Sequence, residues 1–244
     1  NENEISGTIV GVLGSTDDDA GDSHTYSLVS GINFFDISDT TLITTAVFDF
    51  ESQNYYNVRL KSTDNTSLSY EEDFIITVIN VASVIDSVSS TVVDGYYGIG
   101  EVIPITISFD EIITITGTPQ LTLETGITDA VVDYTSGSGS TTLTFNYTVE
   151  SGHASDNLDY ASSAALALNG GTIEDEAGKS AILTLPDVGT SGSLGGNKNI
   201  KLGYPDGASC TSDDQCHSND CDECGECSGD NPTFCFADGL DCIV

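Results

Sequence analysis

The chain has 244 residues and a formal net charge of −34, from 39 acidic and 5 basic residues. So few cations can neither neutralise nucleic-acid phosphates nor dock on an anionic membrane surface, which excludes both of these classes of partner. A hydrophobic content of 38% supports packed cores, and no apolar run approaches the roughly 18 residues that span a bilayer, so no direct membrane insertion is expected. No basic and apolar leader opens the chain, which we therefore expect to be either mature or a fragment of a longer one.

The negative charge is spread over the whole chain. Residues 1–82 carry 14 acids and 2 bases, residues 83–204 carry 15 and 3, and residues 205–244 carry 10 acids and no base. This repulsion strains a compact state unless cations collect on the surface. High salt or abundant divalent metal supplies such cations, so the charge favours an extracellular or cell-surface location.

Residues 1–82 are predicted to be the first of two all-β domains. Alternating segments rich in β-branched residues predict strands at 5–13, 25–29, 42–48, 55–62 and 73–81. Clusters of Asp, Gly, Asn and Ser separate them, and no long segment has a helical period with caps. Strands at this spacing without helices predict a β-sandwich.

Residues 83–204 repeat this pattern. Strands are predicted at 84–90, 102–109, 120–124, 130–135 and 141–149, with further candidates at 181–185 and near 198–203. Residues 161–168 are either a helical turn or a loop, and the glycines of 136–139 indicate a hairpin connection. A long loop is expected at 189–196.

Several motifs of the first segment occur together in one order. They are Glu2-Asn3 with Gly7-Thr8, Asp17-Asp18-Asp19, Thr25–Leu28, Phe48–Glu51, Thr63-Asp64 and Phe74–Val78. In this combination residues 1–82 resemble a cadherin repeat of the bacterial, cadherin-like kind. The resemblance covers nearly the whole segment and implies a β-sandwich with calcium at domain junctions.

Acids of the first segment are candidate calcium ligands, because Ca²⁺ prefers carboxylate and loop carbonyl oxygens. From the residues alone, a solvated acidic loop remains an alternative. The resemblance implies that one end of the domain carries Asp17, Asp19 and Asp64, and the other end Glu2, Asp49 and Glu51. The family's linker D-x-N-D-N is replaced by Asn-Val-Ala-Ser at 80–83, so a complete calcium junction within this chain is not expected.

The second segment resembles another bacterial extracellular module. The matching stretches are Val93–Gly100, Ile105–Glu111, Thr116–Glu124, Tyr134–Val149, Asn169–Ile173 and Glu174–Lys179. Residues 83–204 are similar to an immunoglobulin-like repeat of large secreted and surface proteins. The resemblance implies a β-sandwich that spaces or displays other parts and carries no chemistry.

We expect no enzyme. The three histidines lie in no nucleophile or metal motif, and His24 is expected in a surface loop. Among 39 acids, carboxylate pairs arise by chance, so they do not indicate a glycosidase. Four acids of the second segment are either cation ligands or, by preference, part of an exposed acidic surface: Asp110, Glu111, Asp159 and Asp175.

The composition changes after residue 204, and residues 205–244 are predicted to be a small cysteine-rich module. It contains all seven cysteines: Cys210, Cys216, Cys221, Cys224, Cys227, Cys235 and Cys242. A disulfide framework in an oxidising compartment is the preferred interpretation. A zinc site on the run 221–227 and partial disorder are the alternatives. Because seven is odd, one thiol is left for another chain, for a cysteine beyond residue 244, or unbonded.

The sequence therefore predicts a non-enzymatic extracellular structural protein. We expect two sandwiches and a disulfide module, with Ca²⁺ offsetting the acid repulsion where neighbours meet. The protein would be a subunit of a secreted filament or surface sheath, in contact with itself or with other surface proteins. The alternative is an adhesin or glycan-binding fragment of a large cell-surface protein, in which these domains are spacers.

Overall fold

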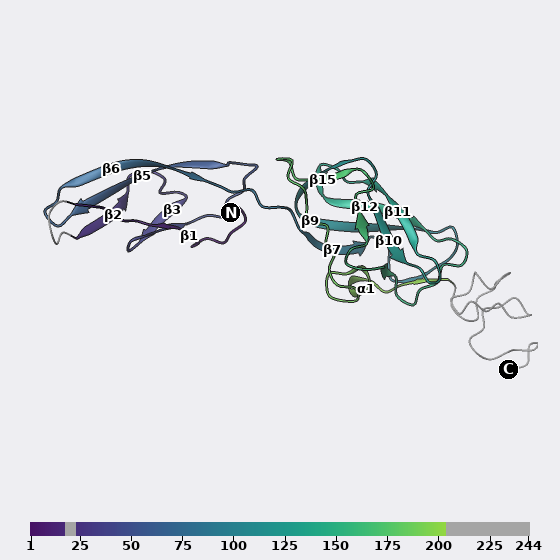
Figure 1. Cartoon of the computed structure of the whole chain (residues 1–244). Helices are drawn as coiled ribbons and strands as arrows, with labels where there is room; N and C mark the ends of the chain where they lie inside the picture. The colour runs from purple at the N-terminus through teal and green to yellow at the C-terminus, as the bar shows by residue number, and fades with distance from the viewer. Residues whose placement is uncertain (18–22, 204–244) are drawn as a thin grey trace, which may run out of the picture. The chain divides into compact units, whose positions relative to one another are not determined.

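The computed structural model of the chain describes residues 1–17 and 23–203 (Figure 1). The chain divides into two compact units, Asn1–Val81 and a second that begins at Ala82. Both consist of strands, and the only helix among the described residues is the single turn α1 (Leu194–Asn197). The all-β fold class predicted from the sequence is confirmed. Nowhere in the described part of the chain is a helix long and apolar enough to cross a bilayer.

The first unit contains two antiparallel sheets of three strands. Their orders are β1-β4-β3 and β2-β5-β6. The strands are β1 (Ile9–Val12), β2 (His24–Leu28), β3 (Phe35–Ser38), β4 (Thr41–Thr44), β5 (Tyr55–Asp64) and β6 (Ser69–Thr77).

The core of the first unit is a small aromatic and aliphatic cluster. The rings of Phe35 and Phe48 stack at 5.4 Å, and Tyr56 lies 4.7 Å from Phe48. Tyr56, Val58 and Leu60 alternate along β5 and are all buried. This period of two directs one side of β5 into the core, and each such side chain contributes about 1.5–3 kcal/mol through its removal from water.

The second unit is larger and is built on one branched sheet. Its main order is β13-β10-β11-β12-β9-β15, with β14 paired to β10 and β7 paired to β9. The strands are β7 (Ile85–Ser90), β8 (Gly95–Tyr97), β9 (Val102–Thr116), β10 (Gln120–Glu124), β11 (Ala130–Ser136), β12 (Ser140–Thr148), β13 (Asp159–Tyr160), β14 (Leu166–Ala167), β15 (Thr172–Glu174) and β16 (Ile200–Leu202).

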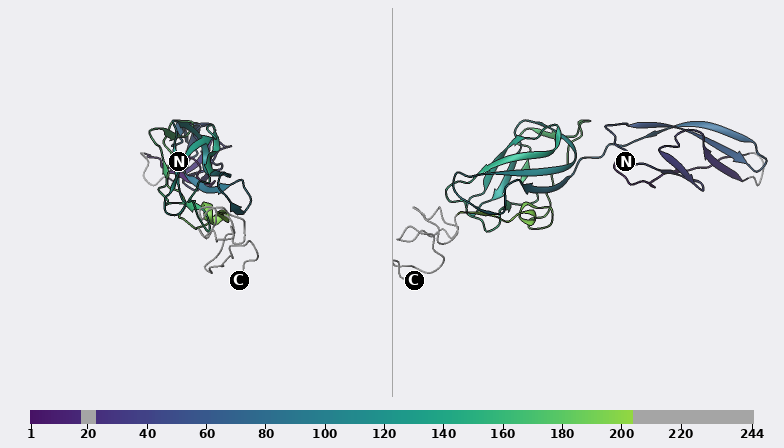
Figure 2. Two further views of the ribbon diagram at one scale, coloured as in Figure 1. Left: turned by 90° about the vertical axis from the view of Figure 1, so that its right-hand side faces the viewer. Right: turned by 180° about the vertical axis from the view of Figure 1, so that it is seen from behind.

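The strand β9 organises the second core. It has 15 residues, and its inward side chains Ile103, Ile105 and Ile107 are fully buried. They pack with Leu143 and Phe145 of the paired strand β12. The right-hand view of Figure 2 shows the strands of the second unit, in teal and green, from behind. A separate parallel pair, β8 with β16, joins residues 95–97 to 200–202.

Two sequence predictions change in the second unit. Residues 181–185 form no strand, because their amides donate to three different segments: Ala181 to Ile173, Ile182 to Ser83 and Leu185 to Ser163. Residues 161–168 form a turn followed by the strand β14, so the helical alternative is wrong and the loop alternative holds only for the part before β14. The expected loop at 189–196 contains the start of α1, whose N-cap is Ser193.

Candidate calcium-binding residues of the first unit

Glu2 carries a buried carboxylate close to the start of the chain. Its side chain is only 2% exposed. Oε1 accepts a hydrogen bond from the backbone N–H of Val81 at 2.7 Å, and Oε2 accepts one from Phe50 at 2.8 Å. The backbone N–H of Glu2 in turn donates to the carbonyl of Ile79 at 3.1 Å. A buried carboxylate that has lost its water is thus fixed by charge-assisted bonds from two distant segments.

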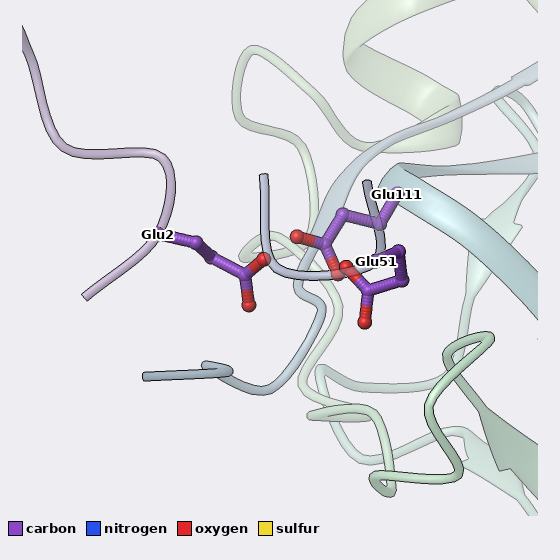
Figure 3. A group of neighbouring side chains, drawn as sticks. All are labelled: Glu2, Glu51 and Glu111. Atoms are coloured by element: carbon purple, nitrogen blue, oxygen red, sulfur yellow. The ribbon is translucent and has the colours of Figure 1, made fainter. Parts of the chain in front are cut away.

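Glu51 lies beside this carboxylate. One of its carboxylate oxygens is within 4.8 Å of an oxygen of Glu2 (Figure 3). The side-chain amide of Asn80 donates to Oε1 of Glu51 at 3.1 Å and thereby positions it. Two carboxylates at this separation repel each other, whereas a divalent cation between them would attract both. The structure therefore brings together two of the six predicted ligands at this end of the unit.

Asp49 has a different role from its neighbour in the sequence. It is exposed, and its Oδ1 accepts a hydrogen bond from the backbone N–H of Ser52 at 3.0 Å. Its carbonyl accepts another from Gln53 at 3.0 Å. These bonds stabilise the turn that carries Glu51. The pKa of Tyr56 is raised above its ordinary value, first by burial and then by the nearby Asp49 charge.

A second set of predicted ligands lines one polar pocket. The pocket has a volume of about 400 Å³, and its lining includes Asp17, His24, Asp64 and Glu72. Oδ2 of Asp17 lies 3.4 Å from Nε2 of His24. The expectation that His24 lies in a surface loop is wrong, because it is the first residue of β2 and its side chain is only 14% exposed. Pairing of β2 with β5 places His24 opposite Asp64.

The carboxylate of Asp64 holds the turn after β5. Its Oδ1 accepts hydrogen bonds from the backbone N–H of Thr66 at 2.8 Å, from Oγ1 of Thr66 at 3.0 Å and from the N–H of Leu68 at 2.9 Å. Desolvation works to raise the pKa of Asp64, but these bonds and the neighbouring His24 outweigh it and lower the pKa. The ionised form is therefore the favoured one at this position.

Sequence reasoning missed Glu72 as a member of this set. It lies on β6, eight positions from Asp64 along the chain, and reaches the pocket only because β5 and β6 form a hairpin. Among the other predicted residues, Asp19 and the seven cysteines lie outside the described residues.

Acids of the second unit serve internal structure. Asp159 and Asp175 are 6% and 2% exposed, so the expectation that they belong to an exposed acidic surface is wrong. Oδ2 of Asp159 accepts hydrogen bonds from Oγ of Ser193 at 2.9 Å and from the N–H of Gly189 at 3.0 Å. Oδ1 of Asp175 accepts one from the N–H of Lys179 at 2.8 Å. Both carboxylates hold loops rather than facing solvent.

The remaining two acids of that set lie within β9, beside the segment that precedes β7. Asp110 is exposed and accepts a hydrogen bond from the N–H of Val84 at 2.8 Å. Glu111, also drawn in Figure 3, accepts one from Oγ of Ser83 at 3.0 Å. Both acids thus bond to the segment that leads into β7.

No family model and no curated protein matches the chain. Solved structures similar to it are extracellular cadherin domains. For mouse Cadherin-23 EC22-24 the identity is 17% and the TM-score 0.32, over 82% of this chain and 59% of that one. For the human Desmocollin-1 ectodomain the identity is 14% and the TM-score 0.35, over 84% of this chain and 40% of that one. For the Protocadherin GammaB4 extracellular domain the identity is 16% and the TM-score 0.37, over 86% of this chain and 35% of that one.

The chain therefore spans less than two thirds of the length of these structures. With identities below 25% and TM-scores below 0.5, the comparison does not extend to ligands, partners or activity.

Proposed function

We propose that the chain is a non-enzymatic extracellular structural protein, a subunit of a secreted filament or surface sheath whose contacts are supported by calcium. The observation that carries this proposal is the pair Glu2 and Glu51. One carboxylate is buried and fixed by two backbone N–H groups, and the second is held within 4.8 Å of it. Such an arrangement suits a hard divalent cation that takes carboxylate oxygens as ligands.

The charge balance of the first unit supports a metal rather than a basic side chain as the neutralising group. Residues 1–82 contain only two bases, Arg59 and Lys61. Arg59 forms its ion pairs with Glu71 and Asp73, at 3.0 and 3.7 Å. A divalent cation from solution would offset the repulsion between Glu2 and Glu51 in a unit this poor in basic side chains.

The polar pocket around Asp17, Asp64 and Glu72 is a second candidate cation site. Three carboxylates from different segments line it. The pocket is also lined by His24, whose Nε2 lies 3.4 Å from Oδ2 of Asp17, and this contact would compete with a metal. We therefore assign this pocket the weaker calcium affinity of the two sites.

Calcium binding is tested by thermal melts of the full chain in EDTA and in millimolar CaCl₂ at matched ionic strength. A ligand that binds only the folded state raises stability by mass action, by about 2.7 kcal/mol at a hundred times its Kd. We expect the melting midpoint to rise with calcium, and the rise to shrink in Glu51→Gln. Asp17→Asn reports on the second site in the same way. Glu4→Gln, at an exposed position, is the matched control. An identical melting midpoint in EDTA and in calcium would contradict calcium binding by the folded chain.

The spacer role within a larger adhesin is the second candidate, and one observation favours it. The buried acids Asp159 and Asp175 of the second unit are occupied by internal hydrogen bonds, so they serve the fold and not a ligand. Electron microscopy and sedimentation of the purified chain in calcium separate the two functions. A filament subunit forms ordered polymers with one repeat, whereas a spacer stays monomeric at high concentration.

A further inference from the structure

Among the described residues, the strand β6 has one edge without a partner strand and an inner face that is only partly covered. It has nine residues, and within the described part of the chain it pairs with β5 alone. Its residue Phe74 lies opposite Val58, which is 1% exposed and belongs to the core. Yet Phe74 itself is 40% exposed, and Tyr70, four residues earlier on the same face, is 68% exposed. The core-facing side of β6 therefore carries two exposed aromatic side chains, one on either side of Glu72, and reaches beyond the cover of the opposite sheet.

A groove runs between the edges of the two sheets at this place. Its volume is about 200 Å³, and it is lined by Val12 and Leu13 at the end of β1, by Tyr70 and Phe74 on β6, and by Leu60 beneath. Like β6, β1 is an edge strand, with β4 as its partner, and Val12 is 76% exposed. An apolar trough beside an open strand edge suits an extended chain, which pairs with the backbone and inserts alternate side chains.

The charge around the groove indicates which kind of partner strand can bind there. Glu71, Glu72 and Asp73 are consecutive on β6, and Glu72 lines the groove. The polar pocket that contains Asp17 shares Tyr70 and Glu72 with the groove. A second copy of this chain would bring further negative charge, since residues 1–82 carry 14 acids and 2 bases. Complementary charge favours a basic partner over a second copy.

We propose that the open edge of β6 accepts an extended strand of a partner protein in which apolar side chains alternate with Lys or Arg. The apolar side chains enter the groove between Val12 and Phe74. The basic side chains lie on the opposite face, where Glu71 and Asp73 project beside Arg59. This site is separate from the Glu2 and Glu51 pair that carries the proposed function, but it shares Glu72 with the second candidate calcium site. Strand binding is therefore measured in EDTA, where the two proposals succeed or fail independently.

The first test uses synthetic peptides and the full chain. The probe is a fluorescein-labelled peptide of nine residues, the length of β6, with alternating Val and Lys. The matched peptide has its central Val replaced by Pro, which keeps the charge but removes a backbone donor and the extended ladder. We expect the uninterrupted peptide to bind at least about tenfold more tightly by fluorescence anisotropy, a difference of about 1.4 kcal/mol. Equal affinities would show charge attraction only and overturn the proposal.

The second test locates the binding edge with two matched variants. Tyr70 and Ile32 are 68% and 67% exposed, and Ile32 lines a groove at the other side of the unit, beside β2 and β3. Tyr70→Ser should weaken peptide binding at least about tenfold, as expected for a buried aromatic anchor, whereas Ile32→Ser should leave it unchanged. Hydrogen exchange at residues 69–77 should slow when the peptide is added. Equal losses of peptide affinity in both variants would overturn the proposal, and so would slower hydrogen exchange outside residues 69–77. Exchange at β6 that slows with increasing protein concentration in the absence of peptide would also overturn it, in favour of binding by a second copy of the chain.

Discussion

The carboxylate of Glu2 accepts backbone hydrogen bonds from Phe50 and Val81, so a substitution that preserves shape but not charge should be costly. In Glu2→Gln an amide N–H₂ faces one of these donors, and a charge-assisted bond is lost. We expect a loss of about 1–3 kcal/mol in the free energy of unfolding in calcium, measured by urea denaturation. The loss should be smaller in EDTA, because the substitution also removes repulsion from Glu51. Glu4→Gln is the control, and an equal effect there would contradict a special role for Glu2.

Asp64 should make the first unit sensitive to acid. Hydrogen bonds from Thr66 and Leu68 outweigh desolvation and hold its pKa below the ordinary value of 3.8. A carboxyl with a lowered folded-state pKa contributes stability that is present above the unfolded pKa and is lost as the pH falls through the folded one. Urea midpoints measured from about pH 5 to pH 2 should therefore fall less steeply in Asp64→Asn than in the natural chain. If the urea midpoints of the natural chain and of Asp64→Asn fell in parallel with decreasing pH, Asp64 would not be the origin of the acid sensitivity.

At the scale of elements, the β11–β12 hairpin depends on a glycine that no other residue can replace. Gly137 has a φ of 115°, and a Cβ added there would lie 2.1 Å from the carbonyl oxygen of Thr142. Gly139, with a φ of 81°, has open space around it. Both alanine substitutions incur backbone strain, but Gly137→Ala adds a clash with β12. We expect it to cost at least about 2 kcal/mol more than Gly139→Ala in chemical denaturation. Equal costs would contradict the close approach.

Strand prediction succeeded where alternation was long and failed where pairing was short. The ten residues of β5 and the nine of β12 bury every second side chain over much of their length, which is visible in the sequence. By contrast, β13 and β14 have two residues each, and β8 and β15 have three, too few to show a period. Residues 181–185 have the right composition but no single partner strand. Such differences come from long-range pairing, which local pattern does not contain.

The candidate site could also be predicted only in part, because motifs are visible in the sequence and long-range contacts are not. Glu2, Glu51, Asp17 and Asp64 were identified by their place in motifs, and the structure shows where each carboxylate lies. The burial of Glu2 was not visible, because its donors are 48 and 79 positions away in the sequence. The groove beside β6 was equally hidden, because it depends on how the end of β1 lies relative to β6 in the fold.

At the scale of the whole molecule, a net charge of −34 should make stability depend on ionic strength. Salt shortens the Debye length from about 30 Å at 0.01 M to about 8 Å at 0.15 M, which weakens repulsion among the acids. We expect the melting midpoint in EDTA to rise over this range with NaCl. Tetramethylammonium chloride should have the same effect if screening is the cause. A midpoint that does not move would show that the acids are too far apart to strain the fold.

The pairing of β8 with β16 also sets an order of events during synthesis of the chain. Every strand of the first unit has been synthesised once residue 81 is made, but β8 must wait for Ile200–Leu202. The amide of Asn197, which donates to the carbonyl of Val88 at 2.9 Å, comes equally late. About a hundred residues separate the two strands, so the core surface that Ile200 and Leu202 cover stays exposed until they are made, a state in which apolar strands aggregate readily. The growing polypeptide is most in need of chaperones during this interval.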